Sequence, residues 1–369
     1  MSMDAAPQAP GGAVRLDVKN DSNIGQFLWM GFYTGVLTLL TLTIYRFWAR
    51  TVVRRRLWGE TTIGEAPLEY TGKGSELFFG FLIAIFTVML PIVGALVGAQ
   101  LLLPPMGVLA VFVVIYLGFF VLIGVAIFLA RRYQLSRTVW RGVRFEQRGS
   151  ALGYGLMAFG YGLLTVLTLG WFAPAMRLRL EKRLWGNAYF GDMPFSYDNS
   201  KEGRTEPVYK SFILAYLGSI LFYAVFFGAM HALGFFNEMT DPTAMPDIAK
   251  IGMLYAVLFG GILLLVLFVA WHEAVMIRQI TKSISLGDVK LSSRFQAWDL
   301  IELAITNTLL IIFTLGIGTL AAQMRVWRRI CRTIDVEGTL DLAQIHQAAS
   351  RGPKSGEGMA DAFDLSGGV

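Results

Sequence analysis

Cysteine, histidine and charge are scarce in this chain. Cys331 is the single cysteine, and only three histidines occur among the 369 residues. One thiol cannot form a disulfide within the chain, and it excludes a metal cluster held by cysteines. Charged residues make up 16% of the sequence, whereas a soluble domain has about 25%. Because 55% of the residues are hydrophobic, this deficit indicates a membrane protein.

The patterns of common catalytic and metal sites are missing as well. His272-Glu273 has no second histidine four residues away, so the helical zinc-protease pattern is absent. The segment Gly72-Lys73-Gly74-Ser75 lacks the rest of a phosphate-binding loop, and we interpret it as a turn. No nucleophile–base pair is visible. We therefore predict a protein that is not an enzyme, with no catalytic residue, no metal site and no cofactor.

What the chain does contain is an internal similarity. Residues 162–197 align with residues 35–70 after a shift of 127 positions, and fourteen of the thirty-six positions are identical. In both copies an apolar run leads into arginines and then into a short Gly/Pro/aromatic segment. A degraded third copy begins at Thr314 and lacks the Trp-Gly pair. Such repetition predicts a duplicated architecture. The expected organisation is a polar N-terminal segment (1–25), a first membrane repeat (26–149), a second (150–298), a partial third (299–348) and a disordered tail (349–369).

Seven apolar runs are long enough to cross a membrane, which takes about 20 residues. They are 27–49, 77–100, 107–130, 150–173, 211–234, 251–273 and 299–321. Of the 32 lysines and arginines, 27 lie in five segments: 46–76, 131–149, 177–210, 274–298 and 325–335. Short loops rich in these residues stay in the cytoplasm. The hairpins 77–130 and 211–273 should therefore enter and leave on the cytoplasmic side.

The run 150–173 conflicts with this topology because basic residues flank it on both sides. Runs 27–49 and 299–321 pose a milder form of the same problem. One solution is that the three runs re-enter or lie near the cytoplasmic interface, with both ends inside. The other is that they span the membrane against the charge rule. The sequence leaves both solutions open.

The segments from Leu57 to Tyr70 and from Leu184 to Tyr197 are rich in glycine, threonine and aromatic residues. This composition favours short strands over helices. We therefore expect an all-α polytopic membrane protein with internal repeats and small cytoplasmic β segments.

The repeated motifs resemble those of a known family. They are Thr-Leu-(Thr/Gly)-(Ile/Trp)-(Tyr/Phe) before the arginines and Arg-Leu-Trp-Gly…Gly-(Glu/Asp)-x-Pro-(Leu/Phe)-x-Tyr after them. The chain is similar over residues 20–345 to the YjgN-type family of bacterial inner-membrane proteins. That resemblance implies a multi-pass protein of the bacterial cytoplasmic (inner) membrane. It implies no activity, cofactor or catalytic residue.

Two basic clusters are the main candidate site. They are Arg50, Arg54, Arg55 and Arg56 after the first run, and Arg177, Arg179, Lys182 and Arg183 after the fourth. Clusters beside a membrane segment can hold anionic head groups, at about 1 kcal/mol per basic residue. They can also do no more than set orientation or form local ion pairs. In a soluble chain the net charge of +6 would suggest nucleic acid, but here the basic residues adjoin apolar runs, so we expect membrane lipids as partners and no nucleic acid.

Four further residues carry a weaker signal. Trp58 and Trp185 follow the clusters, and we expect them to anchor the chain at the membrane interface. Glu302 is an acidic residue inside an apolar run, and Asn307 lies about one helical turn further on. Ionisable groups within a membrane are candidates for function, so this pair is a possible intramembrane polar site.

We predict that the protein binds or senses a lipid or envelope component at the cytoplasmic leaflet. The alternative is a transporter or channel for a small molecule or lipid, because internal repeats and glycine-interrupted runs are typical of transporters. Runs 77–100 and 107–130 contain no ionisable residue, which argues against a proton relay. Protein partners cannot be predicted from the sequence.

Overall fold

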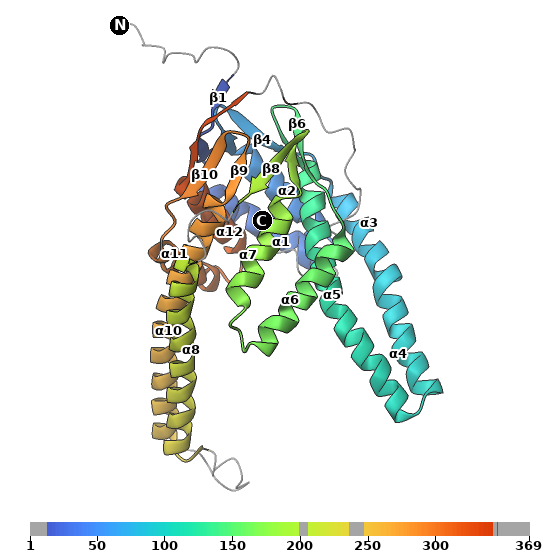
Figure 1. Ribbon diagram of the computed structural model, residues 1–369, viewed down its shortest axis with the longest axis vertical. Helices are drawn as coiled ribbons and strands as arrows, with labels where there is room; N and C mark the ends of the chain where they lie inside the picture. Colours follow the sequence, from blue (N-terminus) through green and yellow to red (C-terminus); the bar gives the residue numbers. More distant parts are fainter. Residues whose placement is uncertain (1–12, 199–205, 236–246, 342–344, 346–369) are drawn as a thin grey trace.

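The computed structural model describes residues 13–198, 206–235, 247–341 and 345. The expected disordered tail and the first twelve residues lie outside the described residues. Strands gather at one end of the molecule, and helical hairpins extend from that end (Figure 1). The chain alternates between the two: pairs of short strands are separated by pairs of helices throughout.

Ten short strands form one antiparallel sheet, in which β2 to β11 follow one another in chain order. They are β2 (Val18–Asn20), β3 (Thr61–Ile63), β4 (Ala66–Tyr70), β5 (Thr138–Trp140), β6 (Val143–Gln147), β7 (Ala188–Phe190), β8 (Met193–Tyr197), β9 (Ile284–Leu286), β10 (Val289–Ser293) and β11 (Ile334–Glu337). The last strand, β11, contacts the first, β2, so the sheet is nearly closed and barrel-like. A separate pair joins β1 (Ala13–Arg15) to β12 (Thr339–Asp341).

The expectation of an all-α protein with small β segments is therefore wrong. The segments 57–70 and 184–197 do contain β3–β4 and β7–β8, but they are parts of a continuous sheet. Two further hairpins, β5–β6 and β9–β10, lie where the sequence shows mainly basic connecting segments. The pairing of β6 with β7, which includes Phe145↔Phe190, joins two strands that a helical hairpin separates in the chain. A strand of three to five residues gives no sign in the sequence of a partner so far away.

Three short helical hairpins extend from the sheet. They are α1 (Ile24–Leu40) with α2 (Arg46–Gly59), α6 (Ala151–Leu167) with α7 (Ala173–Trp185), and α11 (Ala297–Phe313) with α12 (Thr319–Thr333). Each first helix has 17 residues, which is about 25 Å at 1.5 Å per residue. The hydrocarbon core of a bilayer is about 30 Å thick. The runs 27–49, 150–173 and 299–321 thus end short and turn back to the sheet.

The same turn reverses the chain in all three short hairpins. The hydroxyls of Thr41, Thr168 and Thr314 donate to the carbonyl four residues earlier, at 2.7, 2.7 and 2.6 Å. Each hydroxyl also accepts from the amide four residues later, at 2.9, 3.1 and 2.7 Å. The next residue is a left-handed leucine in every case (Leu42, Leu169 and Leu315; φ 49°, 51° and 50°). The threonine compensates for helix-end groups that would otherwise lack partners.

Two long helical hairpins alternate with the short ones. The first runs through α3 (Gly74–Ala84), a π-helical turn (Ile85–Met89), α4 (Leu90–Leu102) and α5 (Pro105–Arg137). The π turn precedes Pro91, which lacks the amide hydrogen that a regular helix needs there. The second consists of α8 (Glu206–Ala232) and α10 (Ile248–Lys282).

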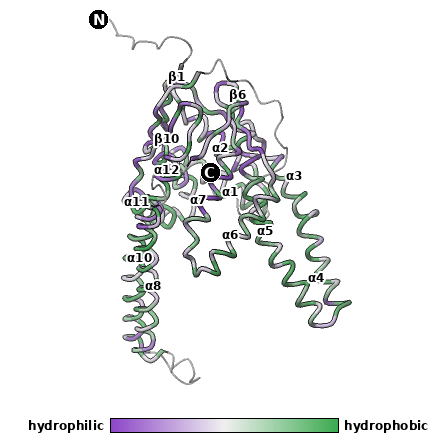
Figure 2. The backbone as a smooth tube through the Cα atoms, in the orientation of Figure 1, coloured by the Kyte–Doolittle hydropathy of each residue, from purple (hydrophilic) through white to green (hydrophobic). Residues whose placement is uncertain are grey.

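Only the long hairpins match the dimensions of a membrane span. Within the described residues, four helices are long and apolar enough to cross a membrane: 74–102, 105–137, 207–232 and 248–282. Figure 2 shows these helices as mostly hydrophobic, with hydrophilic residues gathered toward the sheet. Four of the seven apolar runs thus lie in membrane-length helices. The other three lie in the short hairpins, which return to the sheet.

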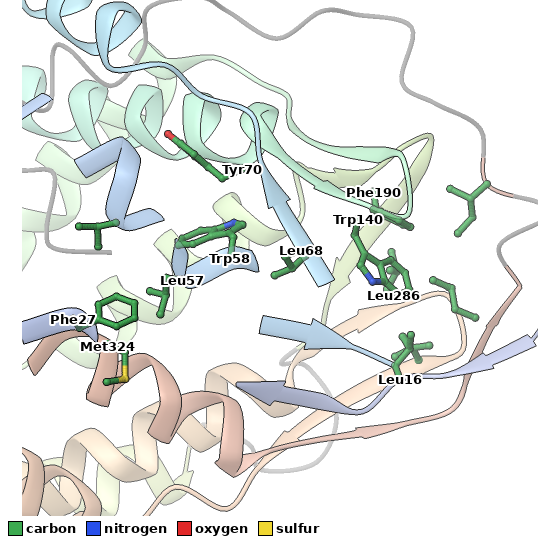
Figure 3. Packing of buried hydrophobic residues seen from close by; sticks show 14 of the residues in the cluster. Leu16, Phe27, Leu57, Trp58, Leu68, Tyr70, Trp140, Phe190, Leu286 and Met324 are labelled. Carbon is green, nitrogen blue, oxygen red and sulfur yellow. The ribbon is translucent and has the colours of Figure 1, made fainter. Parts of the chain in front are cut away.

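The main core cluster lies inside the sheet and at the bases of the short hairpins (Figure 3). Phe27 and Leu57 are fully buried where α1 and α2 meet the sheet. Every strand of the ten also directs an apolar side chain toward the enclosed space: Val18, Ile63, Leu68, Trp140, Phe145, Phe190, Phe195, Leu286, Val289 and Val336. Burial raises the pKa of the Cys331 thiol to about 12, which keeps it protonated at neutral pH.

Candidate functional site

A groove beside the first basic cluster lies between the first and third short hairpins. It has a volume of about 650 Å³. One wall is α1, the second is α2, and the third is the turn before α12 together with the start of α12. The lining residues are Gly31, Thr34, Gly35, Thr38, Leu39, Thr43, Arg46, Ala49, Arg50, Val53, Arg54, Gly316, Ile317, Thr319, Leu320 and Gln323.

Three arginines of α2 line this groove because they recur every four residues. Arg46, Arg50 and Arg54 lie on one helix face, and the first and last are about 12 Å apart along the axis. Among the described lining residues, none is acidic. The three guanidinium groups therefore form a ladder of positive charge along one wall.

Aromatic rings hold the two end members of the ladder. The Arg46 guanidinium lies over Phe47 and Phe81, 5.0 and 5.3 Å from the ring centroids. Arg54 is 5% exposed, and its Nη1 donates to the Tyr70 hydroxyl at 3.5 Å. Burying a guanidinium is costly without compensation. These contacts fix the direction of both side chains.

Small residues and threonines make the wall opposite the arginines. A Cβ at Gly31 would lie 2.2 Å from the Ile317 carbonyl oxygen, so the backbones of α1 and the third turn touch there. Gly35, one turn further along α1, has open space beside it. The Thr34 and Thr38 hydroxyls donate to their own helix, at 2.6 and 2.7 Å. At Gly31 the wall is therefore in close contact with the third hairpin, and at Gly35 it borders open space.

The second basic cluster is arranged differently. The shift of 127 residues places Ala173, Arg177 and Glu181 at the positions of the three ladder arginines. Arg177 Nη1 lies 2.5 Å from a carboxylate oxygen of Glu273 on α10. Glu181 and Glu273 also line the adjacent cavity, which has a volume of about 310 Å³. Carboxylates therefore offset the positive charge here.

The other members of the two clusters lie outside both cavities. Arg55 Nη2 donates to the Gly72 carbonyl at 3.2 Å, and Arg56 bonds Glu60 and Gln26. Arg179 lies over the Phe172 ring, 5.0 Å from its centroid. Lys182 and Arg183 are exposed near the end of α7. The structure thus divides each predicted cluster into separate environments.

The two tryptophans lie at the base of the sheet. Trp58 is 4% exposed, donates to the Thr138 hydroxyl at 3.0 Å and stacks on Trp327 with centroids 5.3 Å apart. Trp185 lines the space inside the sheet, and Arg131 lies over its ring at 4.5 Å. The sequence cannot distinguish this packing from anchoring at an interface, because both place a tryptophan beside an apolar segment.

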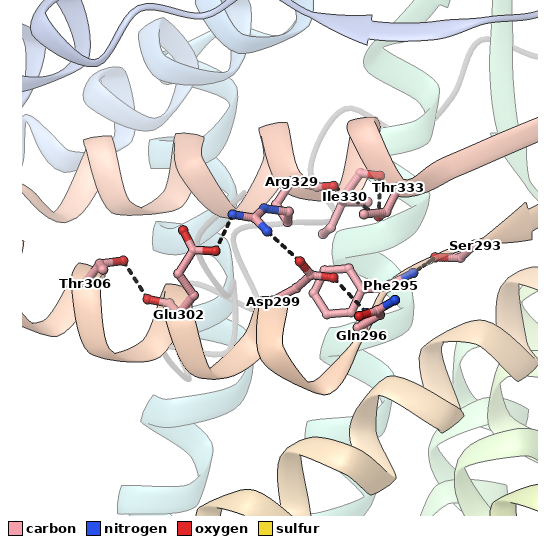
Figure 4. A network of polar contacts seen from close by, with 9 residues as sticks. All are labelled: Ser293, Phe295, Gln296, Asp299, Glu302, Thr306, Arg329, Ile330 and Thr333. Atoms are coloured by element: carbon pink, nitrogen blue, oxygen red, sulfur yellow. Dashed lines mark hydrogen bonds and ion pairs between the residues drawn. The ribbon is translucent and has the colours of Figure 1, made fainter.

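Glu302 belongs to an ionic network between α11 and α12 (Figure 4). Arg329 reaches Glu302 at 2.6 Å and Asp299 at 2.5 Å. Burial lowers the pKa of the Arg329 guanidinium, but hydrogen bonds and charge from these carboxylates raise it above its usual value overall. Asn307 Nδ2 donates to the Ala322 carbonyl at 3.3 Å. Both residues of the predicted polar pair thus join α11 to α12.

No group of three or more metal-ligating side chains occurs in the described part of the chain. His272 Nδ1 lies 3.0 Å from the Ser211 hydroxyl, and that hydroxyl also contacts the Val208 carbonyl at 2.9 Å. The sequence prediction did not include Arg46 in the candidate site, although its four-residue spacing from Arg50 could have revealed it. The threonines of α1 give no such signal, because threonine is common in apolar runs.

A nearly closed antiparallel sheet that carries four helices long and apolar enough to cross a membrane is compatible with a membrane protein. The chain belongs to a bacterial family of unknown function: a family model described as "Bacterial protein of unknown function (DUF898)" matches residues 17–362. The resemblance to the YjgN-type family is thereby confirmed, since the two are the same family. No curated protein and no solved structure matches the chain.

Proposed function

We propose that this is a multi-pass protein of the bacterial cytoplasmic membrane that binds an anionic lipid or envelope component at the cytoplasmic leaflet. In this proposal the two long hairpins cross the bilayer, and the sheet lies in the cytoplasm. The three short hairpins dip into the leaflet and return. That arrangement keeps all five basic segments on the cytoplasmic side, as the charge rule requires.

The arginine ladder carries the proposal. Arg46, Arg50 and Arg54 line the groove, and the end of α1 and the turn after it expose Leu39 and Leu42 at 80% and 85%. The leucines can contact hydrocarbon chains, and the arginines can bind phosphate, since a guanidinium forms bidentate hydrogen bonds with it. A charged group at membrane depth is costly and is a candidate for function. An amphiphile with an anionic head group fits both features.

The first test compares anionic with zwitterionic lipid in detergent solution. The probes are short-chain phosphatidylglycerol and phosphatidylcholine, and the measurement is the shift in Tm on titration. Phosphatidylglycerol should raise the Tm, and phosphatidylcholine should not. Changing Arg46, Arg50 and Arg54 together to Gln should remove about 3 kcal/mol of attraction, which is a loss of about 100-fold in affinity.

The matched control changes the same number of charges on the second hairpin. The variant Arg177→Gln, Arg179→Gln, Arg183→Gln should keep the response to phosphatidylglycerol. The proposal fails if the ladder variant folds and keeps its response. It also fails if the two triple variants lose the response equally, because a general effect of net charge would then explain the result.

The second candidate function is transport. Three guanidinium groups spaced along about 12 Å of one helix could pass an anion from one to the next. This candidate predicts that vesicles containing the protein release an anionic fluorescent lipid or solute faster than empty vesicles. Release that is equal with the wild type and the ladder variant would remove transport as an explanation of the ladder.

A further inference from the structure

A second cavity lies inside the sheet and shares no lining residue with the arginine groove. Its volume is about 320 Å³. All ten strands contribute to its wall. Trp185 of α7, residues of α12 between Trp327 and Cys331, Leu16 and Leu340 of β12 also line it. The cavity therefore belongs to the barrel-like sheet as a whole.

The hydrogen-bonding groups of Thr61, Trp140 and Trp327 in the wall already have partners within the protein. The Thr61 hydroxyl donates to the Leu57 carbonyl at 2.7 Å and accepts from Asn20 and Trp327 at 2.9 and 3.0 Å. Trp140 Nε1 donates to the carbonyl of Ile63 at 3.2 Å. A buried water needs two to four polar partners, and an apolar cavity without them stays dry. This wall favours an apolar occupant over water.

The volume is large for a packing defect. An apolar cavity of about 150 Å³ already binds benzene or xenon, and this one is about twice that size. Ligand pockets begin at about 300 Å³. Eight-stranded barrels either fill their interior with side chains or hold one small ligand, and a sheet of ten strands encloses more space. Protein cores otherwise contain few voids larger than a water molecule.

We propose that the interior of the barrel-like sheet binds a short hydrocarbon chain through apolar contacts alone. The wall gives a polar head group nothing to bind, so only the apolar part of the ligand would enter. That chain could belong to a membrane lipid or to a free fatty acid, since the two present the same chemistry. The site is independent of the arginine groove and of the function proposed for it.

The test is photolabelling of the purified full-length protein. The probes are a 12-carbon fatty acid with a diazirine at its methyl end, and phosphatidylglycerol that carries the same chain. After illumination, labelled peptides are identified by mass spectrometry. We expect label on β10 and on residues 327–331, in addition to label on the long hairpins. The long hairpins serve as an internal control, because any membrane-mimetic environment exposes them to the probe.

A filled cavity should lose the label. Val289→Phe adds bulk inside, and we expect at least a tenfold loss of label at the wall with no change on the long hairpins. Lys290→Phe places the same phenyl ring on the exposed face of the same strand and should label as the wild type does. Leu286→Trp gives an independent second filling if Val289→Phe does not fold.

The outcomes separate the sources and decide the proposal. Wall label from the lipid probe identifies a membrane lipid chain, and wall label from the free acid alone identifies a free chain. The proposal is overturned if the wall stays unlabelled by both probes while the long hairpins are labelled. It is equally overturned if a folded Val289→Phe variant is labelled at the wall like the wild type.

Discussion

The first and second short hairpins have similar sequences and the same turn, yet their basic faces lie in opposite surroundings. On α2 the face carries Arg46, Arg50 and Arg54 and opens into a groove whose described lining has no carboxylate. On α7 the corresponding face keeps only Arg177, which pairs with Glu273 at 2.5 Å. The neighbouring element decides the difference. The first hairpin packs through Gly31 on the turn of the third hairpin, at Ile317. The second hairpin lies beside α10, which supplies the Glu273 carboxylate.

Two basic clusters of similar sequence thus take different partners, because different elements pack beside them. On the second hairpin a carboxylate of α10 holds Arg177 in the packing of helices. On the first hairpin three arginines line a groove. Substitutions in each hairpin separate these two arrangements.

The largest effect should come from the contact that closes the first groove. In Gly31→Leu the new side chain meets the Ile317 carbonyl, where a Cβ alone would lie at 2.2 Å. Overpacking of this kind costs about 1–3 kcal/mol, so the Tm should fall clearly in a thermal unfolding experiment. Gly35→Leu is the control, because nothing lies within 4 Å of its Cβ position. Equal losses in the two variants would contradict the close approach of α1 and the third turn.

The next effect should come from giving the first hairpin the charge of the second. Arg54→Glu copies Glu181 and changes the groove by two charges. At about 1 kcal/mol per charge, affinity for phosphatidylglycerol should fall about 30-fold, as measured by titration calorimetry with the short-chain lipid. Arg50→Gln is a milder companion in case the buried glutamate prevents folding. Unchanged affinity in both variants would show that the ladder does not hold the head group.

A smaller effect should follow from removing the carboxylate that pairs with Arg177. Both partners of this pair are more than a third exposed, so Glu273→Gln should cost less than about 1 kcal/mol of stability. In the Arg46/Arg50/Arg54→Gln background the same change should restore part of the response to phosphatidylglycerol, because Arg177 loses its partner. If the Tm still does not respond to the lipid, releasing Arg177 from Glu273 is not sufficient for the second hairpin to bind phosphatidylglycerol.

The smallest effect is expected at the exposed end of the second cluster. Lys182→Gln should change the free energy of unfolding by less than about 0.5 kcal/mol, because surface substitutions away from special features are nearly neutral. The lipid response should also be unchanged. A loss comparable with that of Arg54→Glu would return Lys182 to the candidate site.

Some of this architecture can be predicted from the sequence. The four long helices follow from uncharged apolar runs, and the short segments after the arginines do contain strands. The continuous sheet cannot be predicted, since the partner of β6 lies beyond a helical hairpin and each strand has only a few residues. Three apolar runs have the length of a membrane span in the sequence, but a turn interrupts each of them. The Thr-Leu motif of that turn resembles ordinary membrane sequence, so the sequence does not reveal the interruption. Within the site, the four-residue spacing of the arginines is visible in the sequence, but the pairing of Arg177 is not, because Glu273 is 96 residues away.

The contact of β11 with β2 has a consequence for how the protein is made. The two strands can come into contact only after the whole span between them has been synthesised, which takes about 15–60 s at bacterial rates of translation. During that time the edge of β2 that faces away from β3 is uncovered, and such edges recruit other strands. Its three residues, with Lys19 at the centre and an ion pair to Asp17, are poorly suited to that kind of recruitment. A short, charged first strand therefore limits pairing with other chains until β11 has been synthesised.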